Sequence, residues 1–333
     1  MGLTFIRGEP GSAAPTGWKD ISGVIRRGAA EDRFPADSRT MLAFRGEEVV
    51  ARLAMGTRDD FAGAQGRTGY VGWYEASDRE AGVALLRRAL EELFAEGAKR
   101  VVGPLNGTTW HRYRLVIPDS EGRKLPGDVP FLSEPGNPIE YPLHFESAGF
   151  EPHLEYESRI IREPQRDPEV FQAAVRLDSL GVTIRGIDMD RFEEELVALH
   201  QLSVIAFAEN PYFSPIGLDE FTAMNRAVRP LVDPALVRLA WGLDGELLGF
   251  VFAFMDPLAT GPRVILKTLV SHPDARAMGL GGLLTDAINR AAAERGASVI
   301  HALMQASNFS TRISSRRDSE LFRRYRLYVA EPG

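Results

Sequence analysis

An internal repeat constrains the fold of this chain more than any other feature of its sequence. Two apolar runs around Gly46 form a hairpin signal that recurs around Gly245, 199 positions later. Strand-like runs at residues 69–72 and 98–102 recur at the same offset. The pattern favours duplication of one unit, and the alternative is chance similarity within one continuous structure. Each half is therefore predicted to contain a hairpin, a strand, a helix and a further strand.

The helix of this unit is clearest in the second half, where it is expected to end at Gly296, just as its first-half counterpart ends at Gly97. Opening helices are less distinct: residues 188–206 carry an apolar face, whereas residues 17–30 are interrupted by glycines. Apolar side chains with helical spacing mark the second-half helix, at Leu280, Leu283, Leu284, Ala287, Ile288, Ala291 and Ala292.

Length and composition fit two α/β domains. The chain has 333 residues, and a charged stretch with two prolines predicts a linker near residues 160–180, between domains at 1–162 and 180–333. The net charge of −7, without a basic block, argues against nucleic acid as a partner. No apolar run is long enough for a membrane span, and residues 1–10 do not resemble a signal peptide, so we expect a cytoplasmic protein.

Cysteine is absent, which excludes disulfides, thiolate metal sites and a cysteine nucleophile. We expect no bound metal. If the protein catalyses group transfer, direct attack within a ternary complex is the simpler mechanism.

A glycine cluster, Arg276-Ala-Met-Gly-Leu-Gly-Gly282, opens the second-half helix directly after the predicted strand at residues 263–271. Backbone N–H groups and the helix dipole meet at such a turn, which makes it an anion site. The dinucleotide fingerprint fails because Leu284 stands where its third glycine belongs, and the Gly-Lys-Ser/Thr phosphate loop is absent. The alternative interpretation is a glycine-rich turn that permits close helix packing.

The pattern Arg/Gln-x-x-Gly-x-Gly/Ala between a strand and a long helix resembles the GNAT acyltransferase superfamily. The resemblance implies two tandem GNAT-like domains, each with a mixed central sheet flanked by helices, and acetyl-CoA as acyl donor. Backbone groups of Leu269 and Val270, with Ser271 as a further candidate, would then pair with the pantetheine arm. The remaining cofactor residues would be Arg276 at the rim, Asn308 after the next strand, and the pyrophosphate-binding N–H groups of Met278, Gly279, Leu280, Gly281 and Gly282.

The first half keeps the order of elements but not the glycine loop. The offset leaves Gly82 as its only matching glycine and places Glu75, Asp78 and Glu80 near the helix start, where carboxylates repel a pyrophosphate. Phe145 stands where the resembled family often has a tyrosine acid. We therefore expect no acyl-CoA in this half.

The segment around Trp110 and His111 is predicted to form a wall of the acceptor pocket, or else a loop that plugs the interface between the halves. Tyr212 and Phe213 follow the second opening helix, a region that often lines the acceptor site in the resembled family. We expect both residues to contact the acceptor.

The general base and acid are less well marked. Acyl transfer to an amine needs a deprotonated amine, and we expect Glu209 to act as the base, although an exposed loop carboxylate without a role is the alternative. Asp256 and His301 are further candidates. Ser315 stands at the position of the family's tyrosine acid. Tyr325 or Tyr328 would replace that acid if the chain end folds into the cleft; otherwise both belong to an ordinary final strand.

Together these features predict an acetyl-CoA-dependent N-acetyltransferase that acts on a small amine, with the first half shaping the acceptor site. A non-catalytic acyl-CoA-binding or scaffold protein is the main alternative, and acetylation of protein lysines is a further one. We expect a monomer, with a dimer as the alternative, because a duplicated unit covers the face that single-domain relatives often use to dimerise.

Overall fold

The structure is a computed structural model that describes residues 2–10, 12, 17–18, 34–64, 66–118, 129–276, 278–306 and 318–333. Most of the predicted opening helix at 17–30, together with Asn308 and Ser315, lies outside these residues.

The first half contains the predicted hairpin, strand, helix and strand. Its hairpin turns at Gly46, whose φ of 67° favours glycine, and Asp78 caps the following helix by accepting a hydrogen bond from the Ala81 N–H at 2.9 Å. The elements are β1 (Leu3–Arg7), β2 (Arg39–Arg45), β3 (Glu48–Arg58), β4 (Thr68–Ala76), α1 (Arg79–Ala95), β5 (Arg100–Gly103), β6 (Leu115–Val116), α2 (Tyr141–Ala148) and β7 (Glu151–Ile161).

The second half repeats this order with additions. Its hairpin turns at Gly245 with a φ of 80°, and its central helix ends before Gly296 with a φ of 61°, as the sequence predicts. The elements are α3 (Phe171–Ser179), β8 (Thr183–Gly186), α4 (Phe192–Phe207), α5 (Leu218–Val228), β9 (Val237–Trp241), β10 (Leu247–Met255), β11 (Arg263–Ser271), α6 (Pro273–Arg276), α7 (Leu280–Ala293), β12 (Ser298–Gln305) and β13 (Glu320–Ala330), with 3-10 turns at Pro168–Val170 and Arg229–Leu231.

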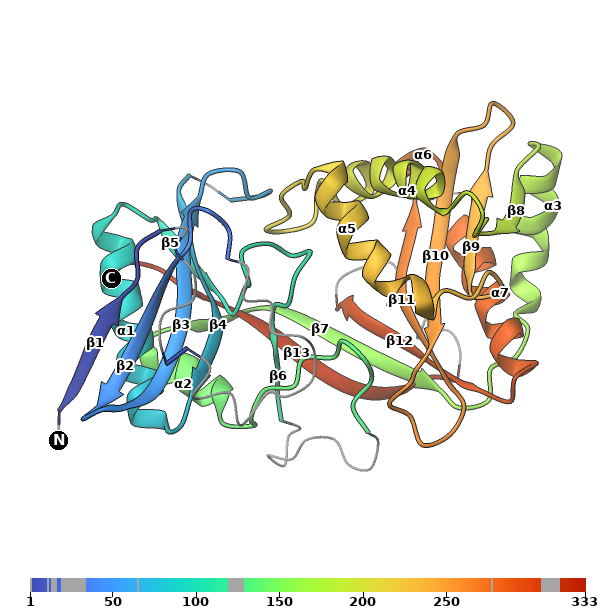
Figure 1. The fold of residues 1–333 in the computed structure, drawn as a ribbon. Coiled ribbons are helices and arrows are strands. Elements are labelled where there is room, and N and C mark those ends of the chain that lie inside the picture. The colour runs from blue at the N-terminus through green and yellow to red at the C-terminus, as the bar shows by residue number, and fades with distance from the viewer. Residues whose placement is uncertain are drawn as a thin grey trace.

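One mixed sheet runs through both halves. Its strand order is β1-β2-β3-β4-β5-β13-β7-β12-β11-β10-β9-β8, with β6 beside β13. The final strands are exchanged: β7 follows the first half in sequence but pairs with β12, whereas β13 follows the second half but pairs with β5. Figure 1 shows these two long strands crossing the middle of the molecule, and both chain ends lie beside the first half.

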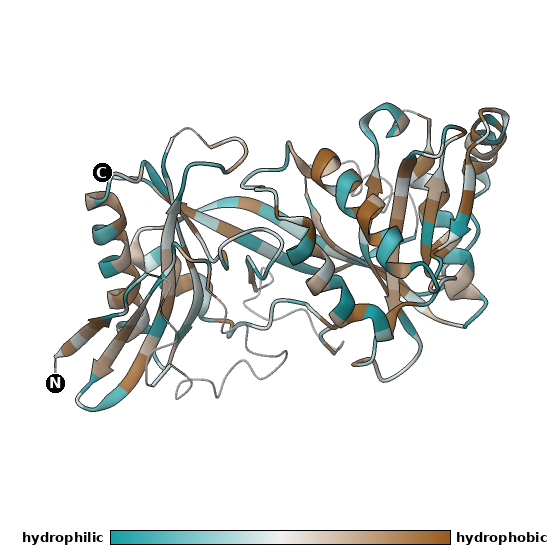
Figure 2. Cartoon of the chain, turned by 45° about the horizontal axis from the view of Figure 1, so that its top comes forward, coloured by the Kyte–Doolittle hydropathy of each residue, from teal (hydrophilic) through white to brown (hydrophobic). Residues whose placement is uncertain are grey.

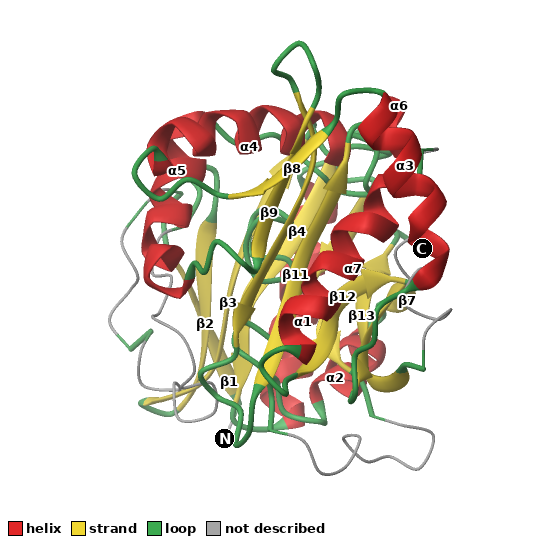
Figure 3. Ribbon diagram, turned by 90° about the vertical axis from the view of Figure 1, so that its right-hand side faces the viewer, coloured by secondary structure: helices red, strands yellow, loops and turns green. Residues whose placement is uncertain are grey.

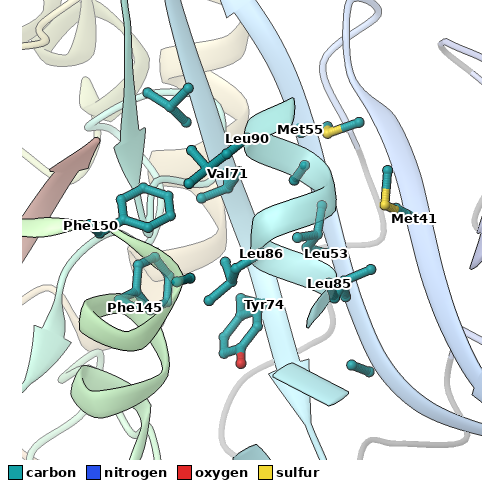
Figure 4. Packing of buried hydrophobic residues seen from close by; sticks show 14 of the residues in the cluster. Met41, Leu53, Met55, Val71, Tyr74, Leu85, Leu86, Leu90, Phe145 and Phe150 are labelled. Carbon is teal, nitrogen blue, oxygen red and sulfur yellow. The ribbon is translucent and has the colours of Figure 1, made fainter. Parts of the chain in front are cut away.

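In the part of the chain that the structure describes, helices cover the sheet on one face in the first half and on both faces in the second. In the first half, α1 side chains such as Leu86 and Leu90 lie against Val71 of β4 and Phe145 of α2 (Figure 4). In the second half, α7 covers one face of the sheet, and α4 and α5 cover the other (Figure 3). Hydrophobic residues follow the strands between these helices (Figure 2).

The predicted linker at residues 160–180 contains a helix that the sequence analysis did not predict. β7 extends to Ile161, and α3 then packs beside the start of α7, where a Cβ on Gly279 would lie 2.8 Å from the Ala173 Cβ. Most side chains of α3 are exposed, so the helix has only a weak apolar pattern. The charged, proline-containing stretch before it was therefore interpreted as part of a linker. The domain limits stay a prediction, because a single sheet joins the two halves.

Within the described residues, no helix combines the length and the apolar character that crossing a membrane would require.

Candidate active site

The strands β11 and β12 separate in the middle of the second half. Their parallel pairing covers only Arg263–Leu266 and Ser298–His301, although β11 continues to Ser271 and β12 to Gln305. The separation begins at a β-bulge, because Leu266 pairs with Ala253 and Thr268 with Phe252, which leaves Lys267 as the extra residue. Beyond the bulge, this edge of β11 has no strand partner in the described structure.

The register of β11 shows which backbone groups face this opening. The His272 N–H donates to the Leu248 carbonyl at 2.7 Å, and alternate residues of a strand direct their backbone groups to the same side. Val270 therefore turns its backbone towards β10, while Leu269 and Ser271 turn theirs towards the opening. Of the residues predicted to pair with a pantetheine arm, Leu269 and Ser271 have the suitable direction.

The glycine cluster forms the start of α7, as the sequence predicts. Gly279 is the N-cap residue with a φ of 86°, and no side chain caps the helix. The first N–H groups of an α-helix have no partner within the helix, so Leu280, Gly281 and Gly282 present theirs at this end. Met278 instead donates its N–H to the Ala275 carbonyl at 3.2 Å.

Arg276 lies beside this helix start and is exposed. Its Nη2 donates to the Ala206 carbonyl at 3.1 Å, near the end of α4, where a cation also interacts favourably with the helix dipole. The guanidinium therefore connects the glycine cluster to α4.

In the first half, the corresponding opening is closed by the chain itself. β4 and β5 pair only over Thr68–Tyr70 and Arg100–Val102, but the Leu105 N–H then donates to the Val71 carbonyl at 2.8 Å. The Trp73 N–H donates to the Asn106 Oδ1 at 2.7 Å. The residues that follow β5 thus occupy the place that stays open beside β11.

The anion site is also missing from the first half. Two residues separate β4 from α1, whereas eight separate β11 from α7, so the uniform offset of 199 does not hold across the glycine loop. Asp78 caps α1 and pairs with Arg45 at 2.7 Å. A carboxylate therefore takes the position at which the second half presents free N–H groups.

A cavity of about 880 Å³ lies between the two halves and reaches the opening beside β11. It has three regions. The first lies in the first half, near Trp73 and Glu75, and the second lies at the opening, between Lys267 and His301. The third region, which we call the α4–α5 chamber, is lined by Phe192, Leu196, Leu199, Phe221, Val237 and Phe250.

The loop around Trp110 joins the halves and also lines the cavity. The Trp110 Nε1 donates to the Ser214 carbonyl at 2.9 Å, and the indole lies against Phe207, Phe213 and Phe221. His111, from the same loop, lies 3.4 Å from Glu220 of α5 and also lines the cavity. The first half thus contributes a wall to a cavity of the second half.

Of the two aromatic residues predicted after α4, Phe213 lines the cavity and Tyr212 does not. Tyr212 is buried at the junction of the halves, where its hydroxyl pairs with the His153 Nε2 at 2.9 Å. Its N–H donates to the Ala62 carbonyl, and the Ala62 N–H donates to the Phe213 carbonyl. The loop after β3 and the loop after α4 therefore hold each other in place (Figure 1).

The central region of the cavity is cationic. Arg114 crosses from the first half to donate to the Leu303 carbonyl at 3.0 Å, and it lies over the rings of Tyr113 and Tyr156. Burial, with the nearby Arg114 and Arg112, lowers the pKa of Lys267 to about 8. No carboxylate of the described chain pairs with Lys267.

Glu75 is the one acidic residue among the described cavity-lining residues, and it lies in the first-half region. Burial raises the pKa of Glu75, although Arg52 lies 3.0 Å away. The Glu75 carboxylate and the Arg52 guanidinium form an ion pair, so neither is an isolated charge in the cavity.

The residues predicted as bases lie in three different environments. Glu209 is exposed and does not line the cavity, although the adjacent Asn210 does. Asp256 is buried and accepts two hydrogen bonds from Arg263, at 2.5 and 2.9 Å, which indicates a structural role. His301 is buried on β12 and lines the cavity at the opening.

Tyr325 lies within the final strand, between β7 and β6, rather than in the cavity. It donates to the Glu134 Oε1 at 2.6 Å, and burial raises its pKa well above the usual range. Tyr328 is buried in the core of the first half. Both tyrosines therefore belong to an ordinary final strand, which was the alternative interpretation of this segment.

Lys267 is the site residue that the sequence analysis missed. The available signal was a single lysine within the apolar run Val-Ile-Leu-Lys-Thr-Leu-Val. Strand periodicity does not reveal a bulge, and the bulge is what directs this side chain into the cavity.

The opening, the uncapped start of α7 and the connecting cavity together fit an acyl-CoA. Backbone groups of Leu269 and Ser271 would pair with its pantetheine arm, and the N–H groups from Gly279 to Gly282 would bind its pyrophosphate. The acyl end would then lie beside Lys267, where the cavity begins.

Comparison with known proteins agrees with this geometry. Residues 197–312 match the acetyltransferase (GNAT) family model, a range that contains the opening, the glycine cluster, α5 and the C-terminal part of α4. A bacterial ceramide synthase of Caulobacter vibrioides (strain NA1000 / CB15N) is 29% identical over 224 residues, which cover 65% of this chain. The match spans 56% of that relative, so the chain covers only about half of its length.

Solved structures share the fold over nearly the whole chain. A tandem GNAT protein from the clavulanic acid biosynthesis pathway is 17% identical, with a TM-score of 0.51 and coverage of 100% of this chain and 99% of its own. A GCN5-related glucosamine N-acetyltransferase region of a fungal multi-domain β-N-acetylglucosaminidase is 13% identical, with a TM-score of 0.58; the match covers 99% of this chain and 38% of that one.

Proposed function

Because this chain belongs to the GNAT family of acyltransferases, in its tandem form, we propose that it transfers an acyl group from acyl-CoA directly to the amine of a small molecule. One observation carries the proposal: β11 separates from β12 beside an uncapped helix start. In the first half, the chain itself fills both positions. Among the described residues, only those of the second half thus offer a place for the donor.

Bound acyl-CoA supplies an activated acyl carbon as a thioester. Leu269 and Ser271 orient the donor through their backbone groups, and a backbone N–H at this edge polarises the thioester carbonyl. The acceptor amine approaches from the cavity side, past the wall that Trp110 and His111 provide. The first half therefore shapes the acceptor site without binding a donor of its own.

Lys267 is the proposed base, in place of Glu209. The Lys267 pKa of about 8 leaves an appreciable neutral fraction near pH 7, and its position at the opening suits proton transfer. As the neutral amine nitrogen bonds to the thioester carbon, neutral Lys267 accepts a proton from that nitrogen, and it returns the proton to the sulfur as the C–S bond breaks. The same burial and cations would lower the pKa of an amine bound there, which favours its reactive form.

The donor that the sequence predicts is acetyl-CoA. The relative named a ceramide synthase points instead to a longer acyl chain, and the cavity has room beyond an acetyl group. A series of acyl-CoAs from two to sixteen carbons, assayed by release of the coenzyme A thiol, separates these donors.

Calorimetric titration with acetyl-CoA and with coenzyme A tests the donor site. We expect micromolar binding to the wild type and its loss in Gly282→Glu, because a carboxylate there faces the pyrophosphate. The substitution is sterically acceptable, since a Cβ on Gly282 would lie 3.6 Å from Val170. Gly261→Glu, at an open loop position, is the matched control and should bind normally.

The two outcomes of this experiment separate the proposal from its alternative. Absence of binding by the wild type would refute the donor site. Binding without thiol release across a broad panel of amines would favour a non-catalytic acyl-CoA-binding or scaffold protein.

A further inference from the structure

The cavity is larger, and its α4–α5 chamber is more apolar, than transfer of an acetyl group to a small amine requires. The whole cavity has about 880 Å³, near the upper end of the range of roughly 300–1,000 Å³ that suits drug-sized ligands. The α4, α5, β9 and β10 side chains that line it are uncharged, and they are mainly aromatic or aliphatic. Such walls favour a hydrocarbon over water.

A loop of the first half packs against one end of this chamber. Trp110 lies between Phe213 of the loop after α4 and Phe221 of α5, and its indole N–H is anchored at 2.9 Å on the Ser214 carbonyl. Arg226 of α5 pairs with Glu193 of α4 at 2.8 Å. These contacts join α5 to α4 and to the loop around Trp110.

The chamber is continuous with the opening beside β11. Phe250 of the chamber and Phe252, two residues further along β10, both line the cavity. Their neighbours across the strand pair are Val270 and Thr268 of β11. A chain attached to a group reacting beside Lys267 can therefore extend between α4 and the sheet without leaving the cavity.

We propose that the α4–α5 chamber binds a long aliphatic chain, carried by the acyl donor or by the amine acceptor. This inference rests on the proposed function for the chemistry at its mouth, but not for the binding of the chain itself. The common chemistry is an unbranched hydrocarbon whose polar end lies at the cationic mouth, near Lys267 and Arg114.

Binding of cis-parinaric acid, a fluorescent chain of eighteen carbons, tests the chamber without any turnover. We expect saturable binding to the wild type and at least tenfold weaker binding to Leu199→Trp, because the indole fills the chamber. Ile205→Trp is the matched control, since Ile205 lies on the exposed face of the same helix. Its binding and activity should equal those of the wild type, and circular dichroism verifies the folding of both variants.

Two substrate series identify which molecule carries the chain. The first pairs acyl-CoAs of two to twelve carbons with ethylamine, and the second pairs acetyl-CoA with alkylamines of two to twelve carbons. Each methylene that enters the chamber should lower the KM about threefold to fourfold in one series. In Leu199→Trp, the preferred chain should be shorter.

Two results would overturn the inference. One is the absence of saturable parinaric acid binding by the folded wild type, and the other is equal binding by Leu199→Trp. Neither depends on catalysis, whereas failure of the proposed function would appear as absent coenzyme A binding or absent turnover.

Discussion

The cost of burying Lys267 gives the sharpest test of the site. Burial and the neighbouring Arg114 and Arg112 lower its pKa from 10.5 to about 8. One pKa unit corresponds to about 1.4 kcal/mol, so the protonated side chain destabilises the folded state by up to about 3 kcal/mol below pH 8. Between pH 8 and 10.5 the unfolded state binds more protons, and stability therefore rises with pH.

Lys267→Met removes this cost while keeping a side chain of similar length. The variant should exceed the wild type in free energy of unfolding by about 1–3 kcal/mol at pH 7, because solvent in the cavity reduces the full value. The difference should shrink above pH 8 and level off near pH 10.5. Urea unfolding at several pH values measures it, and the absence of cysteine removes thiol oxidation as a complication at alkaline pH.

Lys99→Met is the matched control, because Lys99 is an exposed lysine on the surface. Its difference from the wild type should stay near zero across the same pH range. A pH-independent difference for Lys267→Met would refute the reasoning, since it would mean that Lys267 carries its charge in the folded protein as easily as in the unfolded chain.

Further predictions concern the junction and the assigned residues. Asp256→Ala leaves the buried Arg263 without its carboxylate partner and should cost about 3–5 kcal/mol in urea unfolding, with a smaller loss when Arg263→Met is added. Trp110→Ala removes an indole between the halves and should cost about 2–4 kcal/mol, whereas Trp110→Phe, which keeps a ring but not the hydrogen bond to Ser214, should lose about half of that. Glu209→Gln should leave kcat/KM within about twofold of the wild-type value, because the Glu209 side chain is exposed outside the cavity. A hundredfold loss would indicate instead that Glu209 is the base.

Much of the fold was predictable from local patterns. Gly46 and Gly245 mark hairpins because their positive φ angles suit glycine, and the spacing from Leu280 to Ala292 marks α7 because a helix buries one face. The glycine cluster indicated the start of α7 for the same local reason. These features depend on residues that are close in sequence, so a single sequence is sufficient to find them.

Long-range pairing was not predictable in this way. The exchange of β7 and β13 depends on which edge each strand meets, and periodicity is the same for either partner. α3 has few buried side chains, so its apolar pattern is weak. Tyr325 illustrates the difficulty: its sequence fits both a cleft and a strand, and only its pairing with β7 decides between them.

The sequence by itself determined the duplicated α/β unit, the glycine-rich helix start in one half and its replacement by acidic residues in the other. Each of these follows from backbone geometry or charge within a few neighbouring residues. The tertiary structure alone decided that the first-half opening is filled by Leu105 and Asn106, that a bulge turns Lys267 inward, and that Trp110 helps to enclose an apolar chamber. Those outcomes depend on contacts between segments that are far apart in sequence. The free energy of such a contact depends on the positions of both segments, which the local sequence of either one does not specify.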